Sequence, residues 1–430
     1  MHDGAQAQWG DALMSTIAQF RTFGWPSRIL MLNQFGINLG FYMLMPYLAG
    51  YLAGPLGLAG WAIGLVLGVR NFSQQGMFIV GGTLADRFGY KPLIVAGCLL
   101  RTGGFALLVI AQSLPAMVIA SAATGFAGAL FNPAVRAYLA ADSGERRVTA
   151  FAVFNVFYQG GILAGPLVGL ALMAVDFRVT AAAASVVFAV LTVLQLIALP
   201  RDRTEHAAAE RASVLQDWRA VLTNRAFVLF AVAMTGTYAV TFQVYLALPL
   251  HARAIAPEHE SAIVAAIFAV SGLVSIVGQL RITAWFGARF GRAQSVAVGV
   301  GILAAAFIPL IVVPDQSVIG RVPAIAALLV TAALLAVGSA AVFPFEMDTV
   351  VSLSGGRLVA THYGFYNTIV GVGILLGNVG VGALMRTAAD AAWPGLVWVV
   401  LSVLSLVVMF AVGRLHRTGQ LGVAPAASSR

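Results

Sequence analysis

Very few side chains of this chain could do chemistry within its apolar sequence. Arg70 and Arg101 lie inside long apolar runs, and Glu346 and Asp348 follow Pro344 at the end of another run. An ionisable group inside a membrane marks a functional site by default and needs a partner. The two acids are candidates for a group that gains and loses a proton, because burial favours the neutral form of a carboxyl group. Arginine cannot take this role because it stays protonated.

Motifs of soluble enzymes are absent from the sequence. It has no phosphate-binding loop of the Walker type, and its histidines and its single cysteine, Cys98, form no cluster with metal-ligand spacing. We therefore expect a protein that is not an enzyme, that needs no metal or cofactor, and that ATP does not drive directly.

The composition requires a lipid environment. The chain has 430 residues, of which 60% are hydrophobic and only 10% are charged, whereas a soluble protein averages about 25% charged residues. A helix that crosses a bilayer needs about 20 apolar residues. These lengths predict an all-α integral membrane protein with twelve transmembrane helices, near 29–51, 61–81, 92–112, 114–136, 149–174, 179–199, 226–250, 261–281, 294–314, 322–344, 362–385 and 393–413.

The placement of positive charge predicts the orientation. The net charge is +9, but the basic residues do not form a nucleic-acid-binding patch. If the N-terminus is cytoplasmic, that side carries 19 of the 25 Lys and Arg residues, and the other side carries only Arg178, Arg253, Arg321 and Arg386. The positive-inside rule then places both termini in the cytoplasm, in a multi-pass protein of the cytoplasmic (inner) membrane.

A polar interruption divides the chain into two halves. We expect a cytoplasmic segment at 1–25, a six-helix bundle at 26–199, a cytoplasmic linker at 200–224, a second six-helix bundle at 225–415 and a cytoplasmic tail at 416–430.

The two halves resemble each other in sequence. Asn38, Tyr42 and Pro46 match Thr241, Tyr245 and Pro249 at an offset of 203 residues, and Arg87-Phe88-Gly89 matches Arg289-Phe290-Gly291 at an offset of 202. The run Gly161–Gly165 matches Gly373–Gly377 at an offset of 212. Such a duplication is typical of carriers whose substrate site lies between the repeats near the membrane midplane.

Polar side chains form repeat-related stripes on two predicted helices. Polar groups that face lipid are costly, so these stripes face protein or a cavity. Aromatic and amide groups suit a large, mostly apolar ligand, although hydrogen bonding between helices is the alternative. The candidate cavity residues are Gln34, Asn38, Tyr42, Tyr158, Tyr238, Thr241, Tyr245, Tyr366 and Asn367.

Two further motifs combine charge, glycine and proline. One is the loop 82–91, with Gly82, Asp86, Arg87, Gly89 and Lys91. The other is a run inside the fifth predicted span, with Gly161, Gly165, Pro166 and Gly169. The three glycines share one helix face, where small residues allow backbones to approach closely. Pro166 removes one backbone hydrogen bond and bends the helix.

These motifs resemble those of the major facilitator superfamily. The loop 82–91 resembles its signature between helices 2 and 3, and the segment 161–169 resembles the helix-5 motif of its drug:proton antiporter branch. The stretch 64–76, continuing through Asp86 and Arg87, looks like the multidrug-resistance proteins of the MdtH type. The resemblance implies a carrier of two rocking six-helix bundles.

The resemblance also implies roles for individual residues. Asp86 and Arg87 would gate the cytoplasmic side against the opposite bundle, with Asp142, Arg146 and Arg147 as a partner set. The helix-5 glycines would form a close contact between the halves that limits proton leakage.

The sequence departs from the family at three positions. Tyr90 replaces a second basic residue, Ser121 replaces a membrane-embedded arginine, and Asn33 replaces an aspartate early in helix 1.

The expected function is proton-driven export of lipophilic or amphipathic compounds by a monomeric secondary transporter, with the substrate, protons and the bilayer as its partners. A metabolite or lipid carrier on the same fold is one alternative. A receptor or chaperone that does not transport is another, which the cavity stripes and the gate motifs disfavour. A binding and flux assay in proteoliposomes distinguishes the three.

Overall fold

The computed structural model describes residues 18–143, 146–200, 214–290, 292–313, 320–355, 358–391 and 393–421. Within these ranges the chain is almost entirely helical, and no strand occurs. Most of the expected linker, 201–213, lies outside the described residues, as do the first 17 residues and the end of the expected tail, 422–430.

The first half comprises the helices from α2 to α9. Their bounds are α2 (Trp25–Tyr42), α3 (Met45–Ala53), α4 (Gly60–Gln75), α5 (Phe78–Phe88), α6 (Tyr90–Ile110), α7 (Leu114–Ser143), α8 (Arg147–Met173) and α9 (Phe177–Ala198).

The second half follows with α10 (Val214–Thr223), α11 (Arg225–Thr241), the 3-10 turn η2 (Phe242–Tyr245), α12 (Ala247–Ile255), the 3-10 turn η3 (Pro257–His259), α13 (Glu260–Arg289), α14 (Arg292–Ala305), α15 (Ile308–Val312), α17 (Arg321–Leu353), α18 (Val359–Asp390) and α19 (Leu396–Arg417).

Ten helical stretches of the described chain are long and apolar enough to cross a membrane. They correspond to the third through twelfth of the predicted spans. The other two spans are broken helix pairs, α2 with α3 and α4 with α5, and each pair carries buried polar residues such as Asn33 and Arg70. The break shortens each apolar run and the polar residues lower its hydropathy. The all-α architecture is confirmed.

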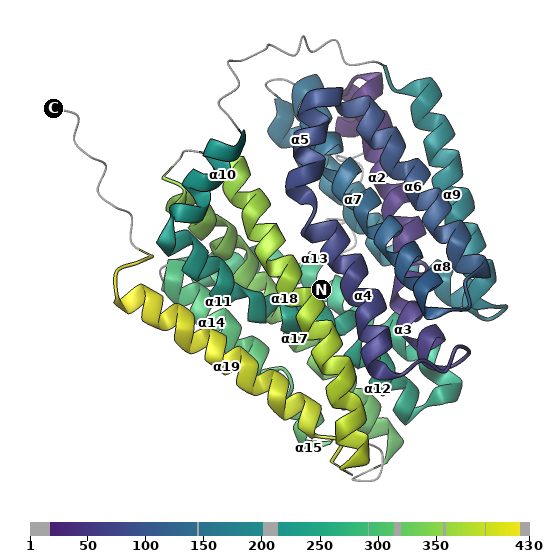
Figure 1. Ribbon diagram of the computed structural model, residues 1–430, viewed down its shortest axis with the longest axis vertical. Coiled ribbons are helices and arrows are strands. Elements are labelled where there is room, and N and C mark those ends of the chain that lie inside the picture. The colour runs from purple at the N-terminus through teal and green to yellow at the C-terminus, as the bar shows by residue number, and fades with distance from the viewer. Residues whose placement is uncertain are drawn as a thin grey trace, which may run out of the picture.

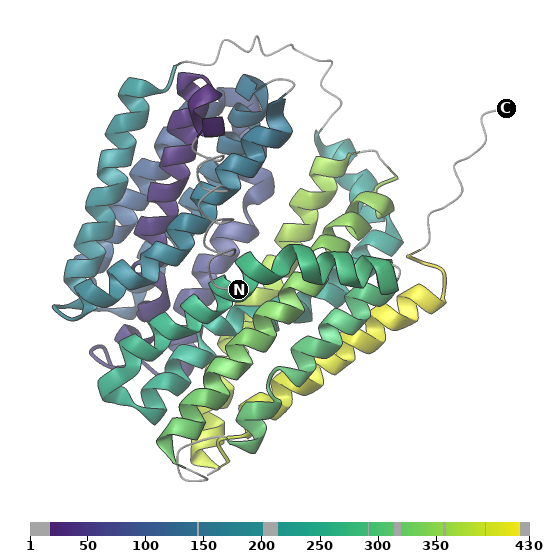
Figure 2. The ribbon, with the colours of Figure 1, turned by 180° about the vertical axis from the view of Figure 1, so that it is seen from behind.

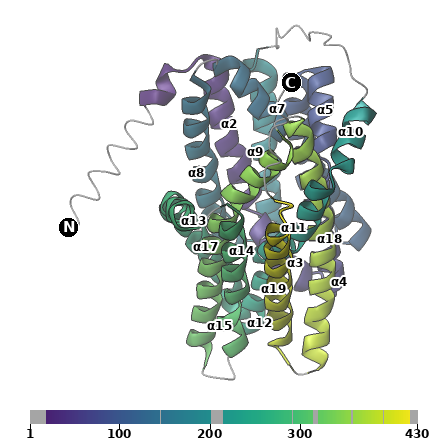
Figure 3. The same cartoon turned by 90° about the vertical axis from the view of Figure 1, so that its left-hand side faces the viewer.

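The two halves touch on one side and separate toward the other. We call the side where α9 ends and α10 begins the linker side, and the opposite side, where α3 packs against α12, the far side. The bundles meet through α4 with α18, α8 with α13, and α3 with α12 and α13. Figures 1 and 2 show them diverging toward the linker side. In Figure 3 α13 is seen almost along its axis, so it is steeply tilted relative to its neighbours.

The helix-5 glycines lie on α8 and face α2 of the same half. A Cβ atom added at Gly161 would lie 2.7 Å from the Cβ atom of Asn38, and one added at Gly165 would lie 2.6 Å from the Cβ atom of Tyr42. Real Cβ atoms almost never approach so closely, so only glycine allows this contact between the backbones.

The end of this glycine face meets the break between α2 and α3. A Cβ atom added at Gly169 would overlap the carbonyl oxygen of Met43, and the hydroxyl of Tyr47 donates a 2.6 Å hydrogen bond to the carbonyl oxygen of Pro166. The expectation that these glycines lie between the halves is wrong, because their face is turned toward the first half. The α8 helix meets the second half through α13 instead.

Adjacent glycines of α8 offer a matched test of this packing. Gly161→Ala is expected to lower stability, because overpacking a tight contact costs about 1–3 kcal/mol. Gly160→Ala should be neutral or slightly stabilising, since its Cβ atom would make an ordinary 3.5 Å contact with Phe35 and alanine favours helix by about 0.5–1 kcal/mol over glycine. Thermal unfolding in detergent measures both, and equal midpoints for the two variants would contradict the packing described above.

Candidate functional site

Two repeat-related tyrosines join the halves near the middle of the molecule. The hydroxyl groups of Tyr42, at the end of α2, and Tyr245, at the end of η2, are 3.3 Å apart. The ring of Phe268 on α13 lies against both, with ring centroids at 6.5 and 5.4 Å. Both tyrosines stand where their helices break, before α3 and before α12. The duplicated position noted in the sequence is thus a direct contact between the two halves.

The polar stripe of α2 hydrogen-bonds within the first half. Gln34 donates a 3.1 Å hydrogen bond to the side-chain oxygen of Asn38, and Asn38 donates one of 2.8 Å to the carbonyl oxygen of Tyr158 on α8. The Oδ1 atom of Asn33 accepts a 2.8 Å hydrogen bond from Gln195 on α9. Hydrogen bonding between helices, the alternative to a cavity, therefore holds for Asn38, whereas Gln34 bonds to a residue of its own helix.

A buried carboxyl group lies in the second half. Glu346 on α17 is 1% exposed, and its carboxyl group accepts a hydrogen bond from the hydroxyl of Tyr366 on α18. Tyr238 on α11 also hydrogen-bonds this carboxyl group, and its ring packs edge-on against that of Tyr366 with centroids 6.2 Å apart. In the described part of the chain, no basic side chain forms an ion pair with Glu346. The carboxyl group is therefore held by neutral partners only.

The structure separates the two acids that the sequence grouped together. The α17 helix continues to Leu353, so Glu346 and Asp348 lie within it rather than at its end. Glu346 faces the interior, whereas Asp348 is exposed. Only Glu346 has the burial that favours a neutral carboxyl group.

Two other candidate cavity residues bond to their own helices. Thr241 donates a 3.4 Å hydrogen bond to the carbonyl oxygen of Tyr238, and Asn367 donates one of 2.8 Å to that of Tyr363. These two hydrogen bonds therefore do not connect the halves.

The two intramembrane arginines flank one aromatic ring. The guanidinium carbons of Arg70 and Arg101 lie 4.3 and 5.0 Å from the ring centroid of Phe41. Arg101 also lies over Phe131 and Phe188, at 4.8 and 5.3 Å, so three rings surround it. Aromatic faces attract such cations in desolvated surroundings.

Arg101 also contacts the helix on which family members carry an arginine. Its Nε atom donates a 3.2 Å hydrogen bond to the carbonyl oxygen of Thr124 on α7. Ser121 on the same helix is fully buried, and its hydroxyl has no hydrogen-bond partner. The guanidinium group of Arg101 on α6 therefore contacts α7 close to Ser121, the position where the resembling family carries an arginine.

Contacts of the described residues of the expected cytoplasmic gate hold parts of the first half together. Lys91 donates hydrogen bonds to the carbonyl oxygens of Leu196 and Leu199, at 2.9 and 2.5 Å. Gly89 has a φ of 89°, which favours glycine, and no atom would lie within 4 Å of a Cβ atom at Gly82. The side chains of Asp86, Arg87 and Arg147 lie outside the described part of the structure.

The other gate candidates hold the chain around the start of α2. The Oδ2 atom of Asp142 accepts hydrogen bonds from the backbone N–H and the hydroxyl of Ser27, at 3.2 and 2.5 Å. Arg146 donates to the hydroxyl and the carbonyl oxygen of Thr22, both at 3.2 Å, and lies over the ring of Phe23. These contacts stabilise the entry into α2. A gate between the halves therefore remains a prediction that depends on Asp86 and Arg87.

On the far side, an ion pair of the second half packs against two glycines of the first half. Arg253 and Glu260 of the second half form an ion pair of 2.9 Å, and Arg253 donates a 3.3 Å hydrogen bond to the carbonyl oxygen of Gly50 on α3. A Cβ atom at Gly50 would overlap the carboxylate of Glu260, and one at Gly54 would overlap the guanidinium of Arg253. We call these four residues the far-side clasp.

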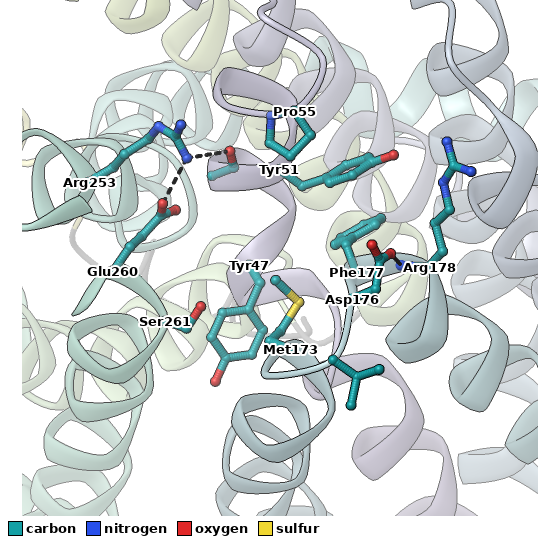
Figure 4. Close-up of a pocket in the computed structure, with 12 residues that line it drawn as sticks. Tyr47, Tyr51, Pro55, Met173, Asp176, Phe177, Arg178, Arg253, Glu260 and Ser261 are labelled. Atoms are coloured by element: carbon teal, nitrogen blue, oxygen red, sulfur yellow. Dashed lines mark hydrogen bonds and ion pairs between the residues drawn. The ribbon is translucent and has the colours of Figure 1, made fainter. Parts of the chain in front are cut away.

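A cavity of about 440 Å³ lies beside the far-side clasp. Figure 4 shows Tyr51 and Phe177 stacked at one side of the cavity and the clasp ion pair at the other. The cavity is lined by residues of both halves, including Asp176 and Ser261. It is therefore a gap in the interface between the halves.

A second glycine seam, on α4, joins the halves and was missed in the sequence. A Cβ atom at Gly60 would overlap the carbonyl oxygen of Gly382 on α18, and one at Gly64 would overlap that of Asn378. A Cβ atom at Gly68 would lie 2.7 Å from Leu375. The spacing of four residues from Gly60 to Gly68 was the available signal, the same spacing as in α8.

Relatives of known sequence align with almost the whole chain. The profile of the Major Facilitator Superfamily matches residues 30–325. An uncharacterized MFS-type transporter of Mycobacterium tuberculosis strain H37Rv is 63% identical over 94% of this chain and 96% of that protein. Multidrug resistance protein MdtH of Salmonella schwarzengrund is 28% identical over 93% of this chain and 96% of that protein.

Solved structures share the fold at low sequence identity. The nucleoside transporter NupG superposes with a TM-score of 0.76 at 15% identity, covering 90% of this chain and 99% of NupG. A POT family transporter in complex with 5-aminolevulinic acid superposes with a TM-score of 0.73 at 12% identity, covering 93% of this chain and 99% of that one. Because the family profile matches more than half of the chain and the helices superpose on those of known transporters, this chain belongs to the major facilitator superfamily and is a multi-pass membrane transporter.

Proposed function

We propose that this transporter exports lipophilic or amphipathic compounds in exchange for protons. The observation that carries the proposal is Glu346, a buried carboxyl group held by two tyrosine hydroxyls and by no basic side chain among the described residues. A carboxyl group in such surroundings is stable when protonated and unfavourable when charged. The similarity to the MdtH multidrug resistance proteins supports a drug-like, apolar substrate.

The contacts between the halves support alternating access by rocking of the two bundles. The far-side clasp, the Tyr42–Tyr245 contact and the α4–α18 seam all hold the halves together on the far side or near the middle. A change of access requires a state in which these contacts break. We assign protonated Glu346 to the state with the far side closed, because its carboxyl group is buried there.

The charge distribution supports an orientation with the linker side in the cytoplasm. The side of the membrane expected to carry 19 basic residues against 4 is also the side on which the sequence places the linker, and the positive-inside rule assigns that side to the cytoplasm. We therefore propose a monomer in the cytoplasmic membrane with both termini in the cytoplasm, acting on a small apolar or amphipathic substrate and on protons without a cofactor.

Glu346 and Asp348 form a matched pair for testing the proton site. Glu346→Gln is expected to abolish accumulation driven by a pH gradient, because the amide cannot gain or lose a proton, while substrate binding stays measurable. Asp348→Asn, an equivalent change at an exposed position two residues away, should keep most of the accumulation. The measurement is dye uptake into inside-out vesicles, with and without collapse of the gradient.

Three results of that experiment would count against the proposal. Full gradient-driven uptake by Glu346→Gln would place the coupling group elsewhere. Loss of dye binding in that variant would make Glu346 a structural or substrate-binding residue. A wild-type protein that ignores the gradient would be a facilitator, or a carrier of a metabolite or lipid coupled to another ion.

The α4–α18 seam gives a second test, of the rocking motion. Gly64→Ala should open the far side, because its methyl group would meet the Asn378 backbone, which cannot move aside as a flexible side chain can. Gly380→Ala on α18 is the control, since no atom lies within 4 Å of its added Cβ atom. The rate at which a maleimide labels Ser261→Cys, in the far-side cavity, should rise only with Gly64→Ala, and an unchanged rate would argue against the seam.

A further inference from the structure

Arg70 carries a positive charge close to the middle of the membrane. It lies ten residues after Gly60, where α4 begins on the far side, and 18 residues before Phe88, where α5 ends on the linker side. At 1.5 Å per residue these separations correspond to about 15 Å and about 27 Å. In carriers built from two repeats, substrate sites lie at this depth, at the interface between the repeats.

All the hydrogen-bond partners of Arg70 are neutral. Its Nη1 atom donates to the Oδ1 atom of Asn71, and its Nη2 atom donates a 2.9 Å hydrogen bond to the Oε1 atom of Gln74. The Nε atom of Arg70 and the Nδ2 atom of Asn71 are buried without a hydrogen-bond partner. Arg70 is 5% exposed and Asn71 is 2% exposed. Two unsatisfied donors therefore lie next to a guanidinium group that is almost completely buried.

No carboxylate compensates this charge in the described part of the chain. Neither Arg70 nor Arg101 forms an ion pair there, and the buried carboxyl group of Glu346 is held by tyrosines of the other half. A buried charge without a counter-charge is strongly unfavourable, and arginine cannot lose its proton to avoid this cost. An anion bound beside Arg70 would supply the missing charge.

Arg70 differs from Arg101 in its access to the interface. Arg101 is enclosed by three aromatic rings of its own half. Arg70 lies over the ring of Phe41, and it follows Gly60, Gly64 and Gly68 on α4, the glycines that pack against α18 of the other half. A rocking motion that separates α4 from α18, and Tyr42 from Tyr245, would open this region to a ligand between the halves. The ring of Phe41 offers an apolar surface next to Arg70, and the ring of Phe268 lies against Tyr42 and Tyr245.

We propose that Arg70 and Asn71 bind the anionic group of an amphipathic substrate, so that the carrier prefers amphipathic anions over cations and neutral compounds. This inference rests on the export function proposed above and specifies its substrate class. The planar guanidinium group is suited to a carboxylate, sulfonate or phosphate, which it can bind through two parallel hydrogen bonds.

Two probes that differ only in their charge test the proposal. Anilinonaphthalenesulfonate and N-phenylnaphthylamine share an aromatic body, and only the first carries a sulfonate. Binding of each is measured by fluorescence in phosphatidylcholine nanodiscs, with empty nanodiscs subtracted. Arg70→Gln should weaken binding of the sulfonate at least tenfold, as expected for the loss of a charge-assisted hydrogen bond, and should leave the neutral probe unchanged. Arg70→Lys should have a smaller effect, since it keeps the charge.

Controls separate this role from a structural one. Arg417→Gln removes an exposed arginine at the end of α19 and should affect neither probe. Lauric acid should displace the sulfonate, whereas inorganic phosphate at the same concentration should not, because it lacks an apolar part.

Several outcomes would overturn the anion site. In Arg70→Gln, an equal loss of binding of both probes, or unchanged binding of the sulfonate, would do so. So would a wild-type protein that binds the neutral probe more tightly than the sulfonate. Displacement of the sulfonate by phosphate as effectively as by lauric acid would also exclude the site. Failure of the export function would look different, since a wild-type protein that binds neither probe would lack the apolar site itself and the anion subsite with it.

Discussion

The need to satisfy polar groups where no water is available determines how this carrier is built. In a membrane interior each backbone N–H and C=O group must find a partner within the protein, so irregular backbone is tolerated only where protein covers it. Buried residues stand at the breaks between α2 and α3 (Met43 and Leu44), between α4 and α5 (Gly76) and between α11 and α12 (Gln243). At the second break, the carbonyl oxygen of Gly76 accepts a 2.8 Å hydrogen bond from Thr368 of the opposite half. Part of the interface between the halves thus lies where their helices are broken.

The two halves have diverged in the kind of charge that they bury. The first half holds two arginines, which are positively charged at all accessible pH values. Among the described residues of the second half, the buried carboxyl group is that of Glu346, whose charge can change. Tyr42 and Tyr245 join the two halves and keep the symmetry of the duplication. We infer that the first half provides a fixed electrostatic environment and the second half provides the group that responds to protons.

Much of the architecture could be predicted from the sequence, whereas most of the contacts could not. The apolar runs predict the helical fold, because length and hydropathy are local properties. The offset of 203 residues pairs Tyr42 with Tyr245, although repeat equivalence alone does not require that the two residues touch. The polarity of Glu346 within an apolar segment identified it as a candidate, but its separation from Asp348 became visible only with the full length of α17.

The remaining errors have a common physical cause. Which way a helix face turns depends on rotation about the helix axis, and neighbours from distant parts of the chain determine that rotation. The glycines of α8 and α4 have the same spacing, yet those of α8 face α2 in their own half and those of α4 face α18 in the other. Asp142 was assigned to a gate by resemblance and instead bonds to Ser27, 115 residues away in the sequence. The sequence around a glycine face or around Asp142 does not indicate which distant residues it will contact.

The central claim is that protonation of Glu346 is coupled to closure of the far side. The most direct test is the distance between spin labels at Gln112→Cys and Asp390→Cys, exposed far-side positions on opposite halves, in a Cys98→Ser background, measured by double electron–electron resonance as a function of pH. Deprotonation disfavours the structure in which this carboxyl group is buried, so raising the pH should shift the wild-type distances to longer values, while Glu346→Gln should keep the short distance at every pH. A wild-type distance that does not respond to pH, or a Glu346→Gln variant that responds as the wild type does, would contradict the account.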